Sequence, residues 1–369
     1  IDIAADIAPT ALPVARGFLV RHLMPSTLQQ WLDTALVGGT LVDGRAVVTG
    51  DLDDWPFTAA EGRFEARGRI EDGVVRFQPD WPAAEGVEAE LAFIGDGFDI
   101  RGSGSVAGVE VGRIRAAMDG YEGGTLEVDA SGNGDVEDLL RLLGQSPLRA
   151  DQPEVFDNLA GRGPAAVDFR LRLPPGNAPL RIGGSVELEG ARLSAPRFGL
   201  ALDQVRGRAA YDQEGFSAEG LTAVHEGRPG RLTLRAGEGH VRDAGNLFEG
   251  ALQARVDART LLDQADALEW LRPHVAGSSQ WTAAVEVARP ADGGRARPRL
   301  RLQSDLVGTT LALPRPLQKA AQAPLPASID VPLPLGDGEV AVTLGTRMAL
   351  LGHTRGDDTG VQIALGSSR

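Results

Sequence analysis

The stretch WLDTALVGGTLVDGRAVVTGDLDDWPF, residues 31–57, decides the fold. Apolar residues recur at three- and four-residue steps, which predicts a helix over 27–37 with one apolar face that buries Trp31. The pair Gly38-Gly39 would end this helix. Apolar and polar residues then alternate over 45–52, which predicts a strand. The building unit is therefore a helix, a glycine stop and an alternating strand.

Parts of this unit recur along the chain. Gly73, Gly190 and Gly308 each begin a short segment that leads to a proline, at intervals of roughly 118 residues, far longer than a solenoid repeat. Further helices are expected over 136–143, 153–160 and 259–272, and the last of these should bury Trp270. We therefore divide the chain into three repeated sections: 1–130, 131–257 and an incomplete 258–369.

Alternating segments fill most of the remaining chain, and turn residues such as Asp72-Gly73 and Gly95–Gly97 predict hairpins between them. In strand after strand one register carries only apolar residues, and the other carries Arg, Glu and Asp. Two interpretations remain open. The apolar register is either the closed core of a sandwich or barrel, or the partly covered face of a curved sheet that holds an apolar ligand.

The apolar register supplies the candidate lining residues of such a face. They are Val48, Phe64, Ile70, Leu91, Phe93, Ile100, Ile114, Met118, Phe169, Leu171, Ile182, Leu188, Leu234 and Val285.

Composition excludes several classes of function. The 369 residues carry a net charge of −14 and no basic, aromatic-rich stripe, which argues against nucleic-acid binding. The absence of cysteine excludes disulfides and thiolate metal sites. No apolar stretch reaches the ~18–20 residues of a membrane span. The chain opens at Ile1 without Met, so we expect it to be a piece of a longer protein.

No catalytic constellation emerges from the sequence. Asp51, Asp53 and Asp54 precede a Trp-Pro pair and lack the spacing of a calcium loop, so they are interpreted as turn formers. The five histidines are scattered without ligand-like spacing. We therefore expect neither enzymatic activity nor a cofactor or metal.

Several motifs resemble the YhdP branch of the AsmA-like family of bridge-like lipid transport proteins. They are WLDTALVGG, GDLDDWPF (Gly50–Phe57), Asp80-Trp81-Pro82, Ser146-Pro147-Leu148 and DLVGTTLALPRPLQK (Asp305–Lys319). The resemblance implies a mainly β fold: an elongated, twisted antiparallel half-pipe with short helices.

The resemblance also implies a function. It implies a protein anchored in the Gram-negative inner membrane by a segment absent here, which carries phospholipid across the periplasm towards the outer membrane, with possible envelope protein partners. No catalytic residues come with it. The rival hypothesis is a structural scaffold of the envelope whose apolar face is a closed core.

Overall fold

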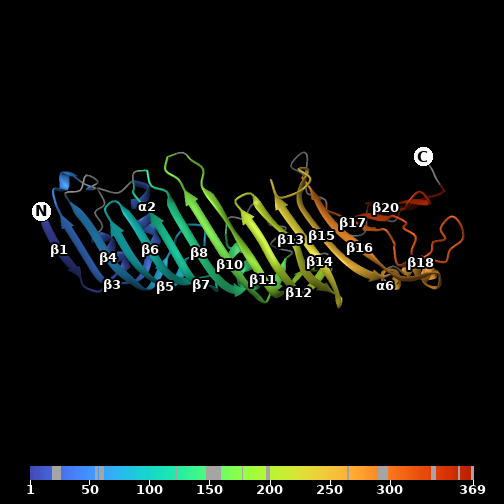
Figure 1. Ribbon diagram of the computed structural model, residues 1–369, viewed down its shortest axis with the longest axis horizontal. Helices are drawn as coiled ribbons and strands as arrows, with labels where there is room; N and C mark the ends of the chain where they lie inside the picture. Colours follow the sequence, from blue (N-terminus) through green and yellow to red (C-terminus); the bar gives the residue numbers. More distant parts are fainter. Residues whose placement is uncertain are drawn as a thin grey trace. The chain divides into compact units, whose positions relative to one another are not determined.

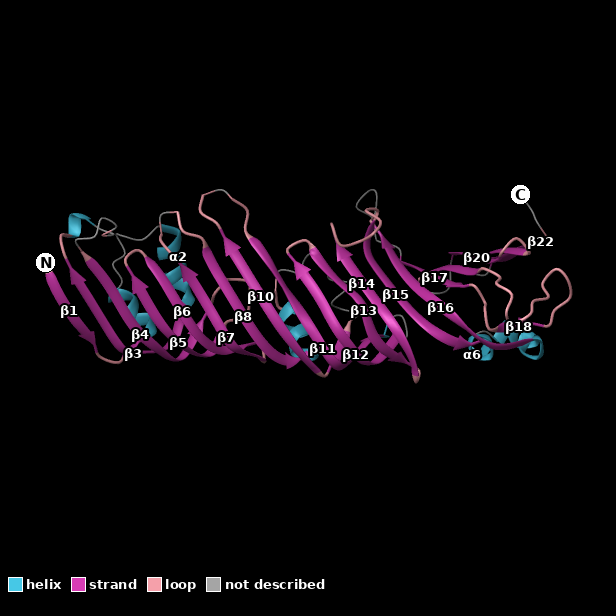
Figure 2. Ribbon diagram, viewed as in Figure 1, coloured by secondary structure: helices cyan, strands magenta, loops and turns pink. Residues whose placement is uncertain are grey.

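The computed structural model describes the chain except for residues 19–25, 55–56, 58–61, 122, 147–158, 177, 197–199, 264–265, 290–297, 334–337, 356–357 and 367–369. Two compact units are present, residues 1–191 and residues 192–369. Strands dominate both units, and helices are few and short (Figures 1 and 2). The expected mainly β fold is confirmed.

Unit 1 is an open antiparallel sheet (blue to green in Figure 1). Its strands follow one another as neighbours from β3 to β8, then β10 and β11, and β1 pairs with the free side of β3. The elements are β1 (Asp2–Ile7), β2 (Thr10–Ala11), α1 (Leu12–Ala15), η1 (Arg16–Phe18), α2 (Ser26–Ala35), β3 (Leu36–Thr49), η3 (Leu52–Asp54), β4 (Arg63–Val75), β5 (Ala84–Ile94), β6 (Gly97–Val106), β7 (Val109–Met118), β8 (Leu126–Asp135), α3 (Val136–Gly144), β9 (Ala160–Arg162), β10 (Pro164–Leu173) and β11 (Arg181–Ala195).

Unit 2 is built in the same way. Successive strands pair antiparallel from β12 to β17, then β19 to β22, and the short β18 pairs with the first residues of β16. The elements are β12 (Leu200–Asp212), β13 (Gly215–His225), β14 (Arg228–Gly237), β15 (Asn246–Asp257), α6 (Ala258–Asp263), η5 (Asp266–His274), β16 (Val275–Ala288), β17 (Pro298–Ser304), β18 (Thr309–Leu311), β19 (Ala327–Pro332), β20 (Gly338–Leu344), β21 (Met348–Arg355) and β22 (Asp358–Leu365).

The helical segments lie at one edge of each sheet. In unit 1, α2 leads into β3, and α3 follows β8; because the intervening strands alternate in direction, β3 begins at the edge where β8 ends. In unit 2, α6 and η5 connect the end of β15 to the start of β16. In each sheet, we call the edge that carries the helical segments the helix edge and the opposite edge the turn edge.

Buried apolar clusters sit at the helix edges. Leu12 of α1 packs with Ile70, Ala84, Val87 and Ala89 of the sheet in unit 1. The corresponding cluster of unit 2 joins α6 to the strands and the loop after β17; it contains Ala258, Leu262, Val275, Leu306, Leu311, Leu325 and Ala327. Each sheet is therefore covered on its apolar side at one edge.

Three of the four helix predictions can be compared with the structure, and the helix expected over 27–37 is present as α2 (Ser26–Ala35). The helix expected over 136–143 is confirmed as α3, which begins where the Asp135 carboxylate accepts a 2.9 Å hydrogen bond from the Glu137 amide. The segment 259–272 forms α6 and the 3₁₀ helix η5. Of the helix expected over 153–160, residues 153–158 lie outside the described part of the chain, and Ala160 already begins β9.

The expected burial of the two helix tryptophans was wrong. Trp31 is 41% exposed and Trp270 is 64% exposed. Trp31 lies beside the segment after β4, where its indole Nε1 donates a 3.0 Å hydrogen bond to the Phe77 carbonyl oxygen. Because these helices lie at the edge of a sheet, only part of each apolar face meets the core.

Two turn predictions based on glycine were also wrong. Gly38 and Gly39 do not end a helix, since α2 stops at Ala35 and both glycines lie inside β3. Asp72-Gly73 lies inside β4. Gly39 has φ +100°, and a Cβ there would lie 2.6 Å from the Gly73 Cα. Gly39 and Gly73 therefore permit β3 and β4 to approach each other closely. Gly95–Gly97, by contrast, forms the expected turn between β5 and β6.

A matching glycine occurs at the start of β16 in unit 2. Gly277 has φ +99°, and a Cβ at this position would collide with the carbonyl oxygen of Gly308. This resembles the Gly39–Gly73 contact, and the resemblance supports the repeated sections, which remain our proposal.

Replacing Gly277 with alanine is expected to destabilise unit 2 by at least about 2 kcal/mol, because a left-handed backbone and a steric clash add together. Gly352→Ala in β21 is the control, since a Cβ there meets its nearest atoms at ordinary distances of 3.8 Å and more. Urea unfolding of both variants tests this. Equal midpoints for the two variants would contradict the role given to Gly277.

Candidate functional site

The apolar face of unit 1 is assembled by cross-strand pairing. Directly paired residues point to the same face of a sheet, so a chain of pairs traces one surface. One such chain runs Leu91–Ile100–Ala116–Val128–Leu171–Ile182 from β5 to β11. A second chain, Gly102–Ile114–Ala130–Phe169–Gly184, runs beside it on the same face.

The structure places all candidate residues of unit 1 on this face. Val48 pairs with Phe64 at one end, and Ala165 pairs with Leu188 at the other. Ile70 and Leu188 are buried, and Ile70 belongs to the core at the helix edge. The other candidates are partly exposed: Val48, Phe64, Leu91, Phe93, Ile100, Ile114, Met118, Phe169, Leu171 and Ile182.

Coverage of the face differs between its two edges. At the helix edge, Leu12 and its neighbours close it. Towards the turn edge, aromatic rings lie along the surface: the ring centres of Phe93 and Phe98 are 6.2 Å apart, and those of Phe98 and Tyr121 are 6.4 Å apart. Phe93, Phe98 and Tyr121 are all partly exposed. Apolar surface therefore meets solvent along this side of unit 1.

Unit 2 has an apolar face of the same kind. The two candidates there, Leu234 and Val285, share it because both pair with Gly250. The same chain of pairs continues through Leu300 to Val331. Leu234, Val285 and Leu300 are partly exposed, and Val331 is buried.

The list of candidate residues omitted several residues of these faces. In unit 1 they include Phe98, Val128, Val167 and Val186, and in unit 2 Phe248, Leu252, Leu302 and Ile329. The signal was present for some of them: Leu126, Val128 and Ala130 alternate with acidic residues. Only the pairing register shows that such a strand belongs beside Phe169.

The opposite face carries ion pairs. In unit 1, Asp99 lies between Arg101 and Arg115, with nitrogen–oxygen distances of 2.7 Å to each. The hydrogen bond from Arg101 and that from Arg115 hold the pKa of the Asp99 carboxyl below its usual value. In unit 2, Asp330 accepts from Arg299 and Arg301 in the same way. The two faces of each sheet therefore differ in charge as the alternation predicts.

Other candidate chemistry has ordinary explanations. Asp51 accepts hydrogen bonds from the Asp53 amide, through its carboxylate, and from the Asp54 amide, through its carbonyl, as a turn former does. Across the described residues no group of three or more His, Asp or Glu could hold a metal ion. No helix in that part of the chain has the length and apolar character required to cross a bilayer.

Comparison with known proteins gives the family. The profile of the family described as YhdP protein matches residues 1–367. The chain belongs to the YhdP family. It is similar to the intermembrane phospholipid transporter YhdP of Escherichia coli (strain K12), with 25% identity over 335 residues that cover 90% of this chain. The chain spans 26% of that relative's length. No solved structure matches the chain.

One motif quoted above for its resemblance to the YhdP family, Asp305–Lys319, has a clear structural role. Lys319 is 3% exposed, and its ammonium donates to the carbonyl oxygens of Leu306 and Thr309, each at 2.7 Å, and of Ala320 at 3.0 Å. Burial lowers the pKa of Lys319. The side chain ties the loop after β17 to β18, so this motif is a structural element of unit 2.

Proposed function

We propose that this chain is a segment of an intermembrane phospholipid transporter and that the apolar face of its sheet holds acyl chains. The observation that carries the proposal is the charge-free register that runs unbroken from β3 to β11, in which the candidate residues other than Ile70 and Leu188 are partly exposed. With a strand spacing of about 4.8 Å, these strands offer an apolar path of about 34 Å.

The physical driving force is burial of hydrocarbon. Each methylene removed from water contributes about 0.8 kcal/mol, so an acyl chain on this face is stabilised without any cofactor. The polar headgroup would remain at the turn edge, where the face meets solvent. The covered helix edge would hold the shape of the sheet while lipid moves along its open side.

The name of the Escherichia coli relative, an intermembrane phospholipid transporter, supports phospholipid as the ligand. We further propose that this segment works in the periplasm, that the parent protein is anchored in the Gram-negative inner membrane, and that transport runs towards the outer membrane. Other envelope proteins are possible partners in this scheme.

The alternative is a scaffold whose apolar face is permanently closed, and the buried clusters at the helix edges are its best support. Native mass spectrometry of the purified chain separates the two. We expect bound phospholipid in the wild type and its loss in Ile114→Asp, since Ile114 lies on the partly exposed apolar face.

Arg113→Gln is the matched control, because Arg113 is exposed on the opposite face and interacts with Ser131. It should keep its lipid. The transporter proposal would be contradicted, and the scaffold favoured, if protein purified under mild conditions contained no phospholipid and took up none from vesicles.

A further inference from the structure

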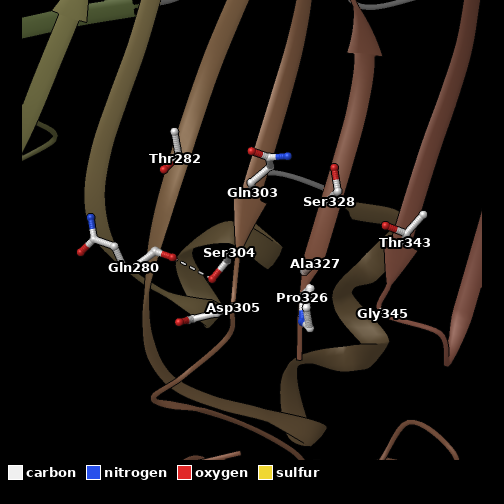
Figure 3. Close-up of a pocket in the computed structure, with 10 residues that line it drawn as sticks. All are labelled: Gln280, Thr282, Gln303, Ser304, Asp305, Pro326, Ala327, Ser328, Thr343 and Gly345. Atoms are coloured by element: carbon white, nitrogen blue, oxygen red, sulfur yellow. Dashed lines mark hydrogen bonds between the residues drawn. The ribbon is translucent and has the colours of Figure 1, made fainter. Parts of the chain in front are cut away.

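A pocket of about 460 Å³ lies on the charged face of unit 2, opposite the apolar face. It is formed at the helix edge by strands β16, β17, β19 and β20 (Figure 3). Its lining residues are Gln280, Thr282, Gln303, Ser304, Asp305, Pro326, Ala327, Ser328, Thr343 and Gly345. The volume falls within the range of small-molecule sites, which is roughly 300–1,000 Å³.

The centre of the pocket is a row of uncharged polar side chains. Thr282 pairs with Gln303, and Ser328 pairs with Thr343, on neighbouring strands joined by the Gln303–Ser328 pair. Figure 3 shows the four side chains side by side on their strands. From a strand spacing of about 4.8 Å, the row is about 14 Å long.

This row departs from the pattern of the charged face. One step towards the turn edge, Arg301 lies between Glu286 and Asp330 and is paired with both. In the row itself, and among the residues that the structure describes, no hydrogen bond to another residue is found for the side chains of Thr282, Gln303, Ser328 or Thr343. Their donors and acceptors are free for a ligand.

The walls of the pocket are held in place. The Ser304 hydroxyl donates a 2.7 Å hydrogen bond to the Gln280 carbonyl oxygen and accepts one of 2.9 Å from the Leu306 amide. Asp305 accepts a 2.9 Å hydrogen bond from the Val307 amide. Pro326 is exposed and adds a small apolar surface beside the polar groups, whereas Ala327 is 6% exposed and belongs to the buried cluster of unit 2.

These groups distinguish between ligand classes. A phosphate is bound best by cationic donors, but the lining contains none and includes the carboxylate of Asp305. A hydrocarbon would leave the amides and hydroxyls unpaired, which is costly. A sugar offers hydroxyl groups that both donate and accept, together with C–H groups that can pack on the exposed Pro326 ring.

We propose that this pocket binds an uncharged oligosaccharide, laid along the row from Thr282 to Thr343. The site is separate from the apolar face, and the proposal does not depend on lipid transport. It would give the segment a second ligand, a neutral glycan, held on the face of unit 2 opposite that unit's own apolar face.

The test is isothermal titration calorimetry of the chain with two neutral probes, maltotetraose and tetra-N-acetylchitotetraose. We expect at least one to bind with a Kd on the order of 1 mM or tighter. Gln303→Ala and Ser328→Ala should each weaken binding by about tenfold or more. Neither substitution disturbs a described hydrogen bond, so the melting temperature should stay unchanged.

Gln362→Ala is the matched control, because Gln362 is exposed on the same face in β22 but lies outside the pocket. It should bind the probe as the wild type does. The proposal is overturned if neither probe binds, if Gln303→Ala and Gln362→Ala behave alike, or if inorganic phosphate occupies the pocket in preference to the sugars.

Discussion

Replacing Phe169 with aspartate is expected to block phospholipid transfer while leaving the fold intact. Phe169 is partly exposed and lies between Ala130 and Gly184 in the middle of the apolar face of unit 1. A charge among acyl chains costs on the order of 2–4 kcal/mol near the centre of a bilayer, which corresponds to at least about a tenfold loss of transfer. Water can reach the new carboxylate from the open side, so the free energy of unfolding should change little.

The measurement is transfer of a fluorescent phospholipid between vesicles by the protein that carries this segment, together with thermal melting. Arg170→Glu is the matched control, since Arg170 is exposed on the opposite face. Leu91 is less suitable for the same substitution, because it packs against the buried cluster at the helix edge. A collapse of the melting temperature in Phe169→Asp would show a closed core at this position and contradict the proposal.

Replacing Lys319 with methionine is expected to destabilise unit 2 by about 3 kcal/mol. Methionine has a similar length but cannot donate, so the carbonyl oxygens of Leu306, Thr309 and Ala320 lose their shared partner in a buried place. Urea unfolding followed by circular dichroism measures this loss.

The matched control is Arg347→Met. Arg347 also donates to a backbone carbonyl, that of Gln318 at 2.8 Å, but it is only half-buried, so its loss should cost less than about 1 kcal/mol. If the two variants unfolded at the same urea concentration, Lys319 would not have the structural role assigned to it.

Much of the fold follows from the sequence because strand periodicity is local. A side chain in a strand points to the face set by its place in the alternation, whichever strand lies beside it. The residues from Phe64 to Ile70 were therefore assigned to the correct face without knowledge of their neighbours. The same holds for α3, whose start is encoded by the nearby Asp135 cap.

Features that depend on neighbouring helices and strands could not be predicted from the sequence. Trp31 and Trp270 lie on helices with an apolar stripe, but the position of these helices at the edge of a sheet leaves both side chains exposed. Gly39 was interpreted as a helix terminator because its true partner, the backbone of Gly73, is brought beside it only by strand pairing.

The two proposed ligand surfaces and the buried hydrogen bonds of Lys319 depend most on tertiary structure. Thr282, Gln303, Ser328 and Thr343 are ordinary polar residues of four strands, and only antiparallel pairing makes them one row. Lys319 is the single lysine of the chain and lies in a loop, a usual setting for a solvated charge. The sequence by itself determined which face each strand residue occupies, because that depends on local geometry. The tertiary structure alone decided which residues meet across strands and loops, because those contacts join distant parts of the chain.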